Sequence, residues 1–191
     1  VIEPRPGEIM FGLNMIVNKG KTVFVGDTSV HEYPTSEQLA EIAISSARVV
    51  RLFGFDPKLA FVSHSTFGQP LTSRTKHIKN AVDILKDKDV DFKFDGDMQP
   101  DVALNDEYKE LYPFSEIVGN ANILIMPGQH SAAISYKMMR ELGGAKVIGP
   151  LLIGLGEPIE IAPLRSSTSD ILNLASVAAY SVGVIDYKKK N

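Results

Sequence analysis

The sequence contains no cysteine, and this absence removes several kinds of chemistry at once. Without thiols there is no disulfide, no thiolate nucleophile and no cysteine-ligated metal site. The chain also lacks an apolar run of the roughly 18 residues that a membrane-spanning helix needs, so no membrane partner is expected. Both absences fit a cytoplasmic protein, which is the location we expect.

An excess of one charge sign is also missing. The 20 Lys and Arg residues against 23 Asp and Glu residues give a formal net charge of −3. A nucleic-acid-binding surface would need clustered Lys and Arg side chains. The one basic run, at residues 188–190, is a terminal tail that we interpret as solvated. Nucleic acid is therefore not an expected partner.

The length of 191 residues corresponds to about one domain, which is large enough to bury a core of its own. We treat residues 1–191 as that domain. The chain begins with Val1 rather than Met, and no signal peptide is visible. From this start we expect a fragment of a longer chain.

Hydrophobic periodicity predicts strands that alternate with helices. A hairpin turn is predicted at residues 18–21, between apolar stretches at 9–17 and 22–25. Thr35 and Gln38 form a capping box that begins the clearest helix, which ends at Gly54. Further strands are predicted at 59–62, 91–96, 121–126, 147–153 and 158–162, and further helices at 73–86, 101–111, 168–182 and from the 127–130 loop to about 142.

This alternation indicates an α/β fold in which a mostly parallel sheet is flanked by helices with right-handed crossovers. Ligands of such sheets lie beyond the carboxyl ends of the strands. The loops to inspect are therefore 63–70, 95–101, 127–130 and 163–169.

The densest polar cluster is the loop before the last predicted helix, which contains Arg165, Ser166, Ser167 and Thr168. The start of a helix favours an anion, because its first N–H groups lack partners and its dipole is positive there. Arg165 would add a fixed positive charge. Ordinary capping by Ser167 or Thr168 is the alternative, and it is compatible with an anion site.

Two other loops contain chemically useful side chains. Ser65 and Thr66 could hold a phosphate or could cap a turn. Asp95, Asp97 and Asp101 could bind a metal or exchange protons, but capping of the short helix after Pro100 by Asp97 and Asp101 is favoured. The four histidines have no i, i+4 spacing, so no metal site is expected.

Six segments form an ordered series, at 34–43, 63–68, 94–99, 121–127, 148–152 and 169–173. Together they resemble the phosphate acetyl/butyryltransferase family. Residues 26–30 followed by 33–35 are most similar to the C-terminal transacetylase-like domain of bacterial hybrid, multifunctional NADP-dependent malic enzymes. The resemblance implies a phosphate acetyltransferase-like, isocitrate/isopropylmalate dehydrogenase-like fold, here truncated at its N-terminal subdomain.

The same resemblance shows where this chain departs from active members of the family. Those members have a Ser-Arg pair that activates the CoA thiol and contacts the anionic substrate, where this chain has Pro163 and Leu164. They also have an Asn in place of Ala133 and a further sheet subdomain with another arginine. The aspartate at Asp170 is retained. Because each lost donor would remove about 3–4 kcal/mol of transition-state stabilisation, efficient catalysis is not expected.

The resemblance therefore implies a regulatory and oligomerisation domain of an NADP-dependent malic enzyme, the enzyme that converts malate to pyruvate and CO2. Acetyl-CoA would be its effector, and the malic enzyme domain of the same chain and further copies of the chain would be its partners. NADP and the divalent metal would belong to the malic enzyme domain, with no cofactor or metal here. The expected ligand contacts are Ser65, Thr66, Arg165, Ser166, Ser167, Thr168, Asp170 and Asn173.

Two other functions remain open. The first is an active phosphate acetyltransferase, which converts acetyl-CoA and phosphate to acetyl phosphate and CoA, with Asp170 as the base that deprotonates the thiol. The second is an assembly module that binds no ligand.

Overall fold

A computed structural model describes residues 2–117 and 119–190, without the side chains of Lys109 and of residues 183–190. The lysines of the basic tail therefore lie outside the described side chains. The strands form one seven-stranded sheet in the order β4-β3-β5-β2-β1-β6-β7. They are β1 (Phe11–Asn18), β2 (Lys21–Gly26), β3 (Lys58–Val62), β4 (Lys93–Met98), β5 (Ile123–Ile125), β6 (Lys146–Ile153) and β7 (Ile159–Glu160).

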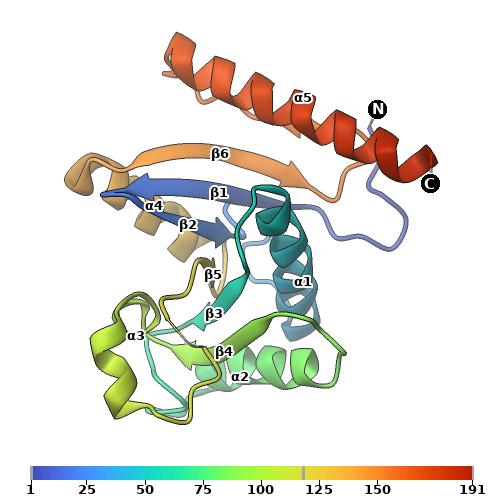
Figure 1. Ribbon diagram of the computed structural model, residues 1–191. Coiled ribbons are helices and arrows are strands. Elements are labelled where there is room, and N and C mark those ends of the chain that lie inside the picture. The colour runs from blue at the N-terminus through green and yellow to red at the C-terminus, as the bar shows by residue number, and fades with distance from the viewer. Residues whose placement is uncertain (1, 118, 191) are drawn as a thin grey trace.

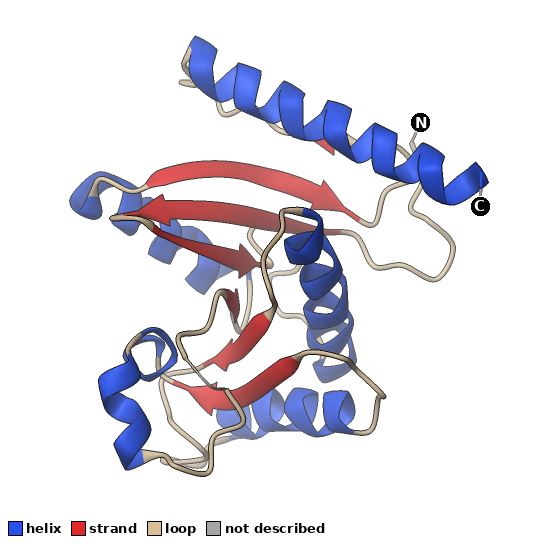
Figure 2. Cartoon of the chain, in the orientation of Figure 1, coloured by secondary structure: helices blue, strands red, loops and turns tan. Residues whose placement is uncertain are grey.

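The sheet is mixed, and most of its strands run in one direction. Strands β2, β5, β3 and β4 pair in parallel, whereas β1 is antiparallel to both β2 and β6. The predicted hairpin joins β1 to β2, with Lys19 and Gly20 at positive φ in its turn. The expected α/β fold, a mostly parallel sheet flanked by helices, is confirmed (Figure 2).

Helices cover both faces of the sheet (Figure 1). Neighbouring strand residues point to opposite faces, so Phe24 enters the core beneath α1 and α2 while Val25 enters the core shared with α3 and α4. The helices are α1 (Ser36–Leu52), α2 (Ser73–Lys86), α3 (Pro100–Leu104), a 3-10 helix (Asp106–Leu111), α4 (Gln129–Gly143) and α5 (Thr168–Lys190).

Local signals decide the bounds of α1. The Gln38 N–H donates to Thr35 Oγ1 at 3.2 Å, and the Thr35 N–H donates to Gln38 Oε1 at 2.8 Å, so the predicted capping box is confirmed. Gly54, at φ +83°, follows the last turn. By contrast, β4 begins two residues later than predicted, at Lys93, because this residue pairs with Lys58, the first residue of β3. Asp91 lies before the pairing and accepts hydrogen bonds from Arg51 instead.

Helix α5 lies along the edge of the sheet that β6 and β7 form (Figure 1). It extends to Lys190, beyond the predicted end at residue 182. Leu174 is its one buried residue among those with described side chains. No helix within the described ranges is long and apolar enough to cross a membrane.

Candidate functional site

The candidate site is a cavity of about 660 Å³ between the C-terminal half of α4, the start of β6 and the start of α5. Its size is in the usual range for small-molecule sites. The charged or polar side chains that line it are Tyr136, Arg140, Glu141, Lys146, Arg165, Ser166, Asp170 and Asn173.

The start of α5 is organised by a reciprocal cap between Ser167 and Asp170. The Ser167 N–H and hydroxyl both donate to Asp170 Oδ2, at 2.9 and 2.7 Å, and the Asp170 N–H donates to Ser167 Oγ at 3.2 Å. The predicted capping by Ser167 is therefore confirmed. These bonds from Ser167, assisted by the charges of Lys146 and Arg140, lower the pKa of Asp170 below its ordinary value.

Positive charge exceeds negative charge around the cavity. Arg140, Lys146 and Arg165 line it together with two acids, Glu141 and Asp170. Arg140 is already paired with Glu141 at 2.8 Å, whereas the exposed Arg165 has no hydrogen bond or ion pair with any described residue. A cavity with a spare guanidinium suits an anionic ligand.

Asn173 provides a second unused donor on the same cavity. Its Nδ2 atom is buried and has no hydrogen-bond partner among the described residues. An orphaned buried donor costs about 1–3 kcal/mol, and a ligand oxygen would satisfy it. Arg165 and Asn173 therefore offer a charged and a neutral donor to one cavity.

The structure brings only part of the predicted ligand set together. Arg165, Ser166, Asp170 and Asn173 line the cavity. Ser167 and Thr168 are exposed at the start of α5, beside the cavity lining. Ser65 and Thr66 are buried in the loop after β3 and line no part of this cavity. Ligand contact by these eight residues stays a prediction.

Ser65 and Thr66 belong to a separate network around Asp97 at the end of β4. The Ser65 hydroxyl donates to Asp97 Oδ2, the Gly68 N–H donates to Asp97 Oδ1 at 3.0 Å, and the Gln99 N–H donates to Thr66 Oγ1 at 3.3 Å. Ser65 and Asp97 are 0% and 1% exposed. This network stabilises the 63–68 loop from within.

The capping role predicted for Asp97 is wrong. Gln99 is the N-cap of α3 and makes no side-chain cap bond. The carboxylate of Asp97 is used by the neighbouring loop instead, and Asp101 lies in the first turn of α3. Asp95 accepts the backbone N–H groups of Gly96 and Glu116, so the acids serve different segments.

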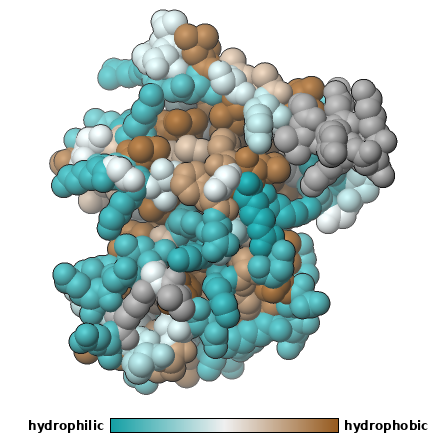
Figure 3. Space-filling model, viewed as in Figure 1, coloured by the Kyte–Doolittle hydropathy of each residue, from teal (hydrophilic) through white to brown (hydrophobic). Residues whose placement is uncertain are grey.

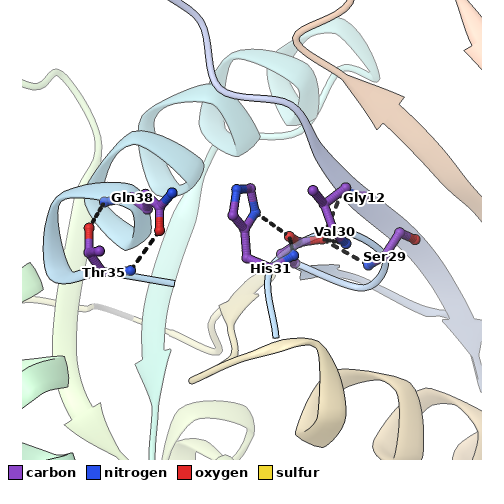
Figure 4. A network of polar contacts seen from close by, with 7 residues as sticks. Gly12, Ser29, Val30, His31, Thr35 and Gln38 are labelled. Atoms are coloured by element: carbon purple, nitrogen blue, oxygen red, sulfur yellow. Dashed lines mark hydrogen bonds and ion pairs between the residues drawn. The ribbon is translucent and has the colours of Figure 1, made fainter. Parts of the chain in front are cut away.

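A buried carboxylate that the sequence reasoning missed is Asp27, which follows β2. Its two oxygens accept backbone N–H groups from Gly12, Ser29, Val30 and His31 at 2.7–3.1 Å, and Oδ2 lies 2.7 Å from His31 Nδ1 (Figure 4). The only local signal was an acidic residue directly after an apolar strand, before a Thr-Ser pair. Asp27 fixes the loop that connects β2 to α1.

No metal centre is formed by the residues that the structure describes. They contain no group of three or more His, Asp or Glu side chains that could hold a metal ion. The charged groups of the candidate cavity are three cations and two carboxylates.

The sequence is similar to one known protein family and to individual proteins. The profile of the family described as Phosphate acetyl/butaryl transferase matches residues 1–179. The NADP-dependent malic enzyme of Rhizobium meliloti is 47% identical over 182 residues, which are 95% of this chain and 24% of that protein. The phosphate acetyltransferase of Clostridium acetobutylicum is 37% identical over 93% of this chain and 56% of that protein.

Solved structures show the same relationship. A phosphotransacetylase from Streptococcus pyogenes superposes with a TM-score of 0.88 at 31% identity, over 95% of this chain and 56% of the other. The chain thus spans about a quarter of the malic enzyme and about half of each of these two transacetylases.

Proposed function

The chain belongs to the phosphate acetyl/butaryl transferase family, and from this premise we propose that it binds acetyl-CoA in the α4–β6–α5 cavity without transferring its acetyl group. As part of a longer chain, it would regulate a cytoplasmic NADP-dependent malic enzyme and contribute to its oligomerisation. The malic enzymes among its relatives support this assignment. Regulation requires that acetyl-CoA binds more tightly to one state of the distant active site.

The observation that carries the proposal is the cap between Asp170 and Ser167. A base that removes the proton of the CoA thiol works best when its pKa is raised towards the working pH. The pKa of Asp170 is instead lowered, because its Oδ2 atom accepts two hydrogen bonds from Ser167, one from the hydroxyl and one from the backbone N–H. Pro163 and the fully exposed Leu164 offer no side-chain donor to a developing oxyanion.

Binding itself is supported by the unused donors. The Arg165 guanidinium can pair with a phosphate of CoA in bidentate fashion, and Asn173 Nδ2 can donate to a carbonyl oxygen of the pantetheine arm or the thioester. Lys146 adds positive charge to the same cavity. These contacts hold a ligand and require no proton transfer.

Four measurements test the proposal. Calorimetric titration of the chain with acetyl-CoA is expected to give saturable binding, and thermal unfolding in the presence of acetyl-CoA is expected to show a raised melting temperature. A thiol-release assay with acetyl-CoA and phosphate is expected to give no turnover. In the full-length protein, NADPH formation from malate is expected to change when acetyl-CoA is added. Absence of binding would favour the ligand-free assembly module.

An active phosphate acetyltransferase is the second candidate, favoured by the position of Asp170 on the cavity wall and by the transacetylases among the relatives. It would require Asp170 to leave its cap and accept the thiol proton. Turnover in the thiol-release assay that Asp170→Asn abolishes would replace the binding-only proposal with this one.

A further inference from the structure

A second cavity, of about 150 Å³, lies further along α5, near the middle of the helix. It is lined by the C-terminal half of α1, strands β6 and β7, the N-terminal segment and α5. Apolar side chains form much of its wall, and Figure 3 shows hydrophobic surface below α5 on this face of the molecule. The charged and titratable residues that face it are Arg5, Glu8, Arg48, Glu157, Glu160 and Tyr180.

Glu160 on β7 is the unusual member of this set. Its Oε2 atom is buried and has no hydrogen-bond partner among the described residues. Burial raises the pKa of Glu160 from its ordinary value of 4.5 to about 7. The carboxyl group is therefore neutral in mildly acidic solution and becomes charged near neutrality.

The nearby cations are engaged elsewhere. Arg48 Nη1 lies 3.2 Å from Glu8 Oε1, and Arg5 Nη1 lies 3.7 Å from Glu8 Oε2. Arg48 also donates to Ser45 Oγ at 2.8 Å. Because Glu8 holds both guanidinium groups, the ionised form of Glu160 has no cation bound to it.

Helix α5 forms part of the wall of both cavities. Asp170 and Asn173 line the candidate site, and Val177 and Tyr180 line the second cavity two turns further along. Over residues 168–182, whose side chains are described, its attachment is light: Leu174 is the one buried residue, and one hydrogen bond, from Tyr180 Oη to the Leu52 carbonyl at 3.0 Å, joins it to α1. A segment with so few buried contacts opens locally at low cost.

We propose that Glu160 is a proton-controlled latch for α5: the neutral carboxyl group lets α5 dock, and the ionised group releases it. Water that enters on release hydrates the charge, which the docked helix prevents. Release would move Asp170 and Asn173 away from the candidate site. The latch does not depend on the ligand, and only its effect on acetyl-CoA affinity rests on the proposed function.

The direction in which pH changes the docking of α5 follows from proton linkage. Docked α5 holds Glu160 at a raised pKa, so between about pH 4.5 and 7 the docked form binds more protons than the released form. Docking is therefore strongest in acid and weakens as pH rises through this window. Between pH 6 and pH 8 the release equilibrium increases by at most about tenfold, and solvent screening of the half-buried group reduces this to several-fold.

Hydrogen exchange of residues 168–180 at pH 6 and pH 8 tests the latch, after correction for the intrinsic pH dependence of exchange. In the unmodified chain we expect corrected exchange to be several-fold faster at pH 8. Glu160→Gln should remove this difference. Glu157→Gln is the matched control, because Glu157 faces the same cavity but is exposed, and this variant should keep the difference.

Two results would overturn the latch. One is equal corrected exchange at both pH values in the unmodified chain, as expected if Arg5 or Arg48 moved from Glu8 to Glu160. The other is a carboxyl titration of Glu160 by NMR with a midpoint near 4.5, which needs no variant. If the chain shows the exchange difference but does not bind acetyl-CoA, the latch proposal stands and the proposed function is rejected.

Discussion

The hydroxyl of Ser65 donates to the buried carboxylate of Asp97, 32 residues further along the chain. The bond joins the loop after β3 to the end of β4, and the Gly68 N–H completes the arrangement. Both partners are almost fully buried, so the charge of Asp97 is compensated by protein donors and not by water.

Ser65→Ala should therefore destabilise the chain, because it removes one donor from a buried charge. We expect a loss of about 1–3 kcal/mol in the free energy of unfolding, measured by urea denaturation. Ser73→Ala, at an exposed position in the first turn of α2, is the control and should change stability by less than about 0.5 kcal/mol. Equal effects of the two variants would contradict the role of the Ser65–Asp97 bond.

Asp27 should be the more sensitive carboxylate, because it accepts four backbone N–H groups. We expect Asp27→Ala to cost more than about 3 kcal/mol in unfolding free energy, since these buried donors lose their acceptor. Asp27→Asn should cost less, because it retains the oxygen that accepts from Gly12, Ser29 and Val30. The graded order in urea denaturation is the measurement, and an inverted order would contradict this account.

The parts of the fold that could be predicted are those with local causes. The bounds of α1 and α2 follow from an apolar stripe and a side-chain cap a few residues away. The position of β5 between β2 and β3 depends on contacts between distant segments, and no local pattern encodes it. Asp97 was misassigned because its partners Ser65 and Gly68 lie 32 and 29 residues away. For Asp27 only the Gly12 N–H is distant, and the other three N–H donors lie within four residues, so a local turn around it could have been considered.

The candidate site also has features that could be predicted from the sequence and features that could not. The polar loop before α5 and its cap at Ser167 were visible as a local pattern. Ser65 and Thr66 follow β3, whereas the cavity lies at the start of β6, three strands away in the sheet, so the contact with a ligand that the resemblance implies for them stays a prediction. The unpaired Nδ2 donor of Asn173 could not be predicted from the sequence. Whether this atom finds a hydrogen-bond partner depends on the tertiary packing around it.

The cap of α5 should weaken in acid. Hydrogen bonds from Ser167 lower the pKa of Asp170, so its contribution is present above the ordinary value of 3.8 and is lost as pH falls through the lower folded value. Hydrogen exchange in the first turn of α5, corrected for intrinsic rates, should therefore accelerate below about pH 4. Asp170→Asn should remove this acid sensitivity, and persistence of the acceleration in that variant would contradict the cap as its cause.

Arg165 and Asn173 should each contribute to ligand binding without being needed for the stability of the free protein. Arg165→Ala removes an exposed, unpaired cation, so the unliganded stability should stay within about 0.5 kcal/mol while acetyl-CoA affinity falls about tenfold or more. Asn173→Ala removes an orphaned buried donor, so unliganded stability should stay level or rise by up to about 1 kcal/mol while affinity falls.

The control is Arg74→Ala, which changes an exposed arginine on α2 outside this cavity and should alter neither stability nor affinity. Calorimetry and urea denaturation of the same three variants separate the two effects, and loss of stability without loss of affinity in Asn173→Ala would show that this amide serves the fold and not the ligand.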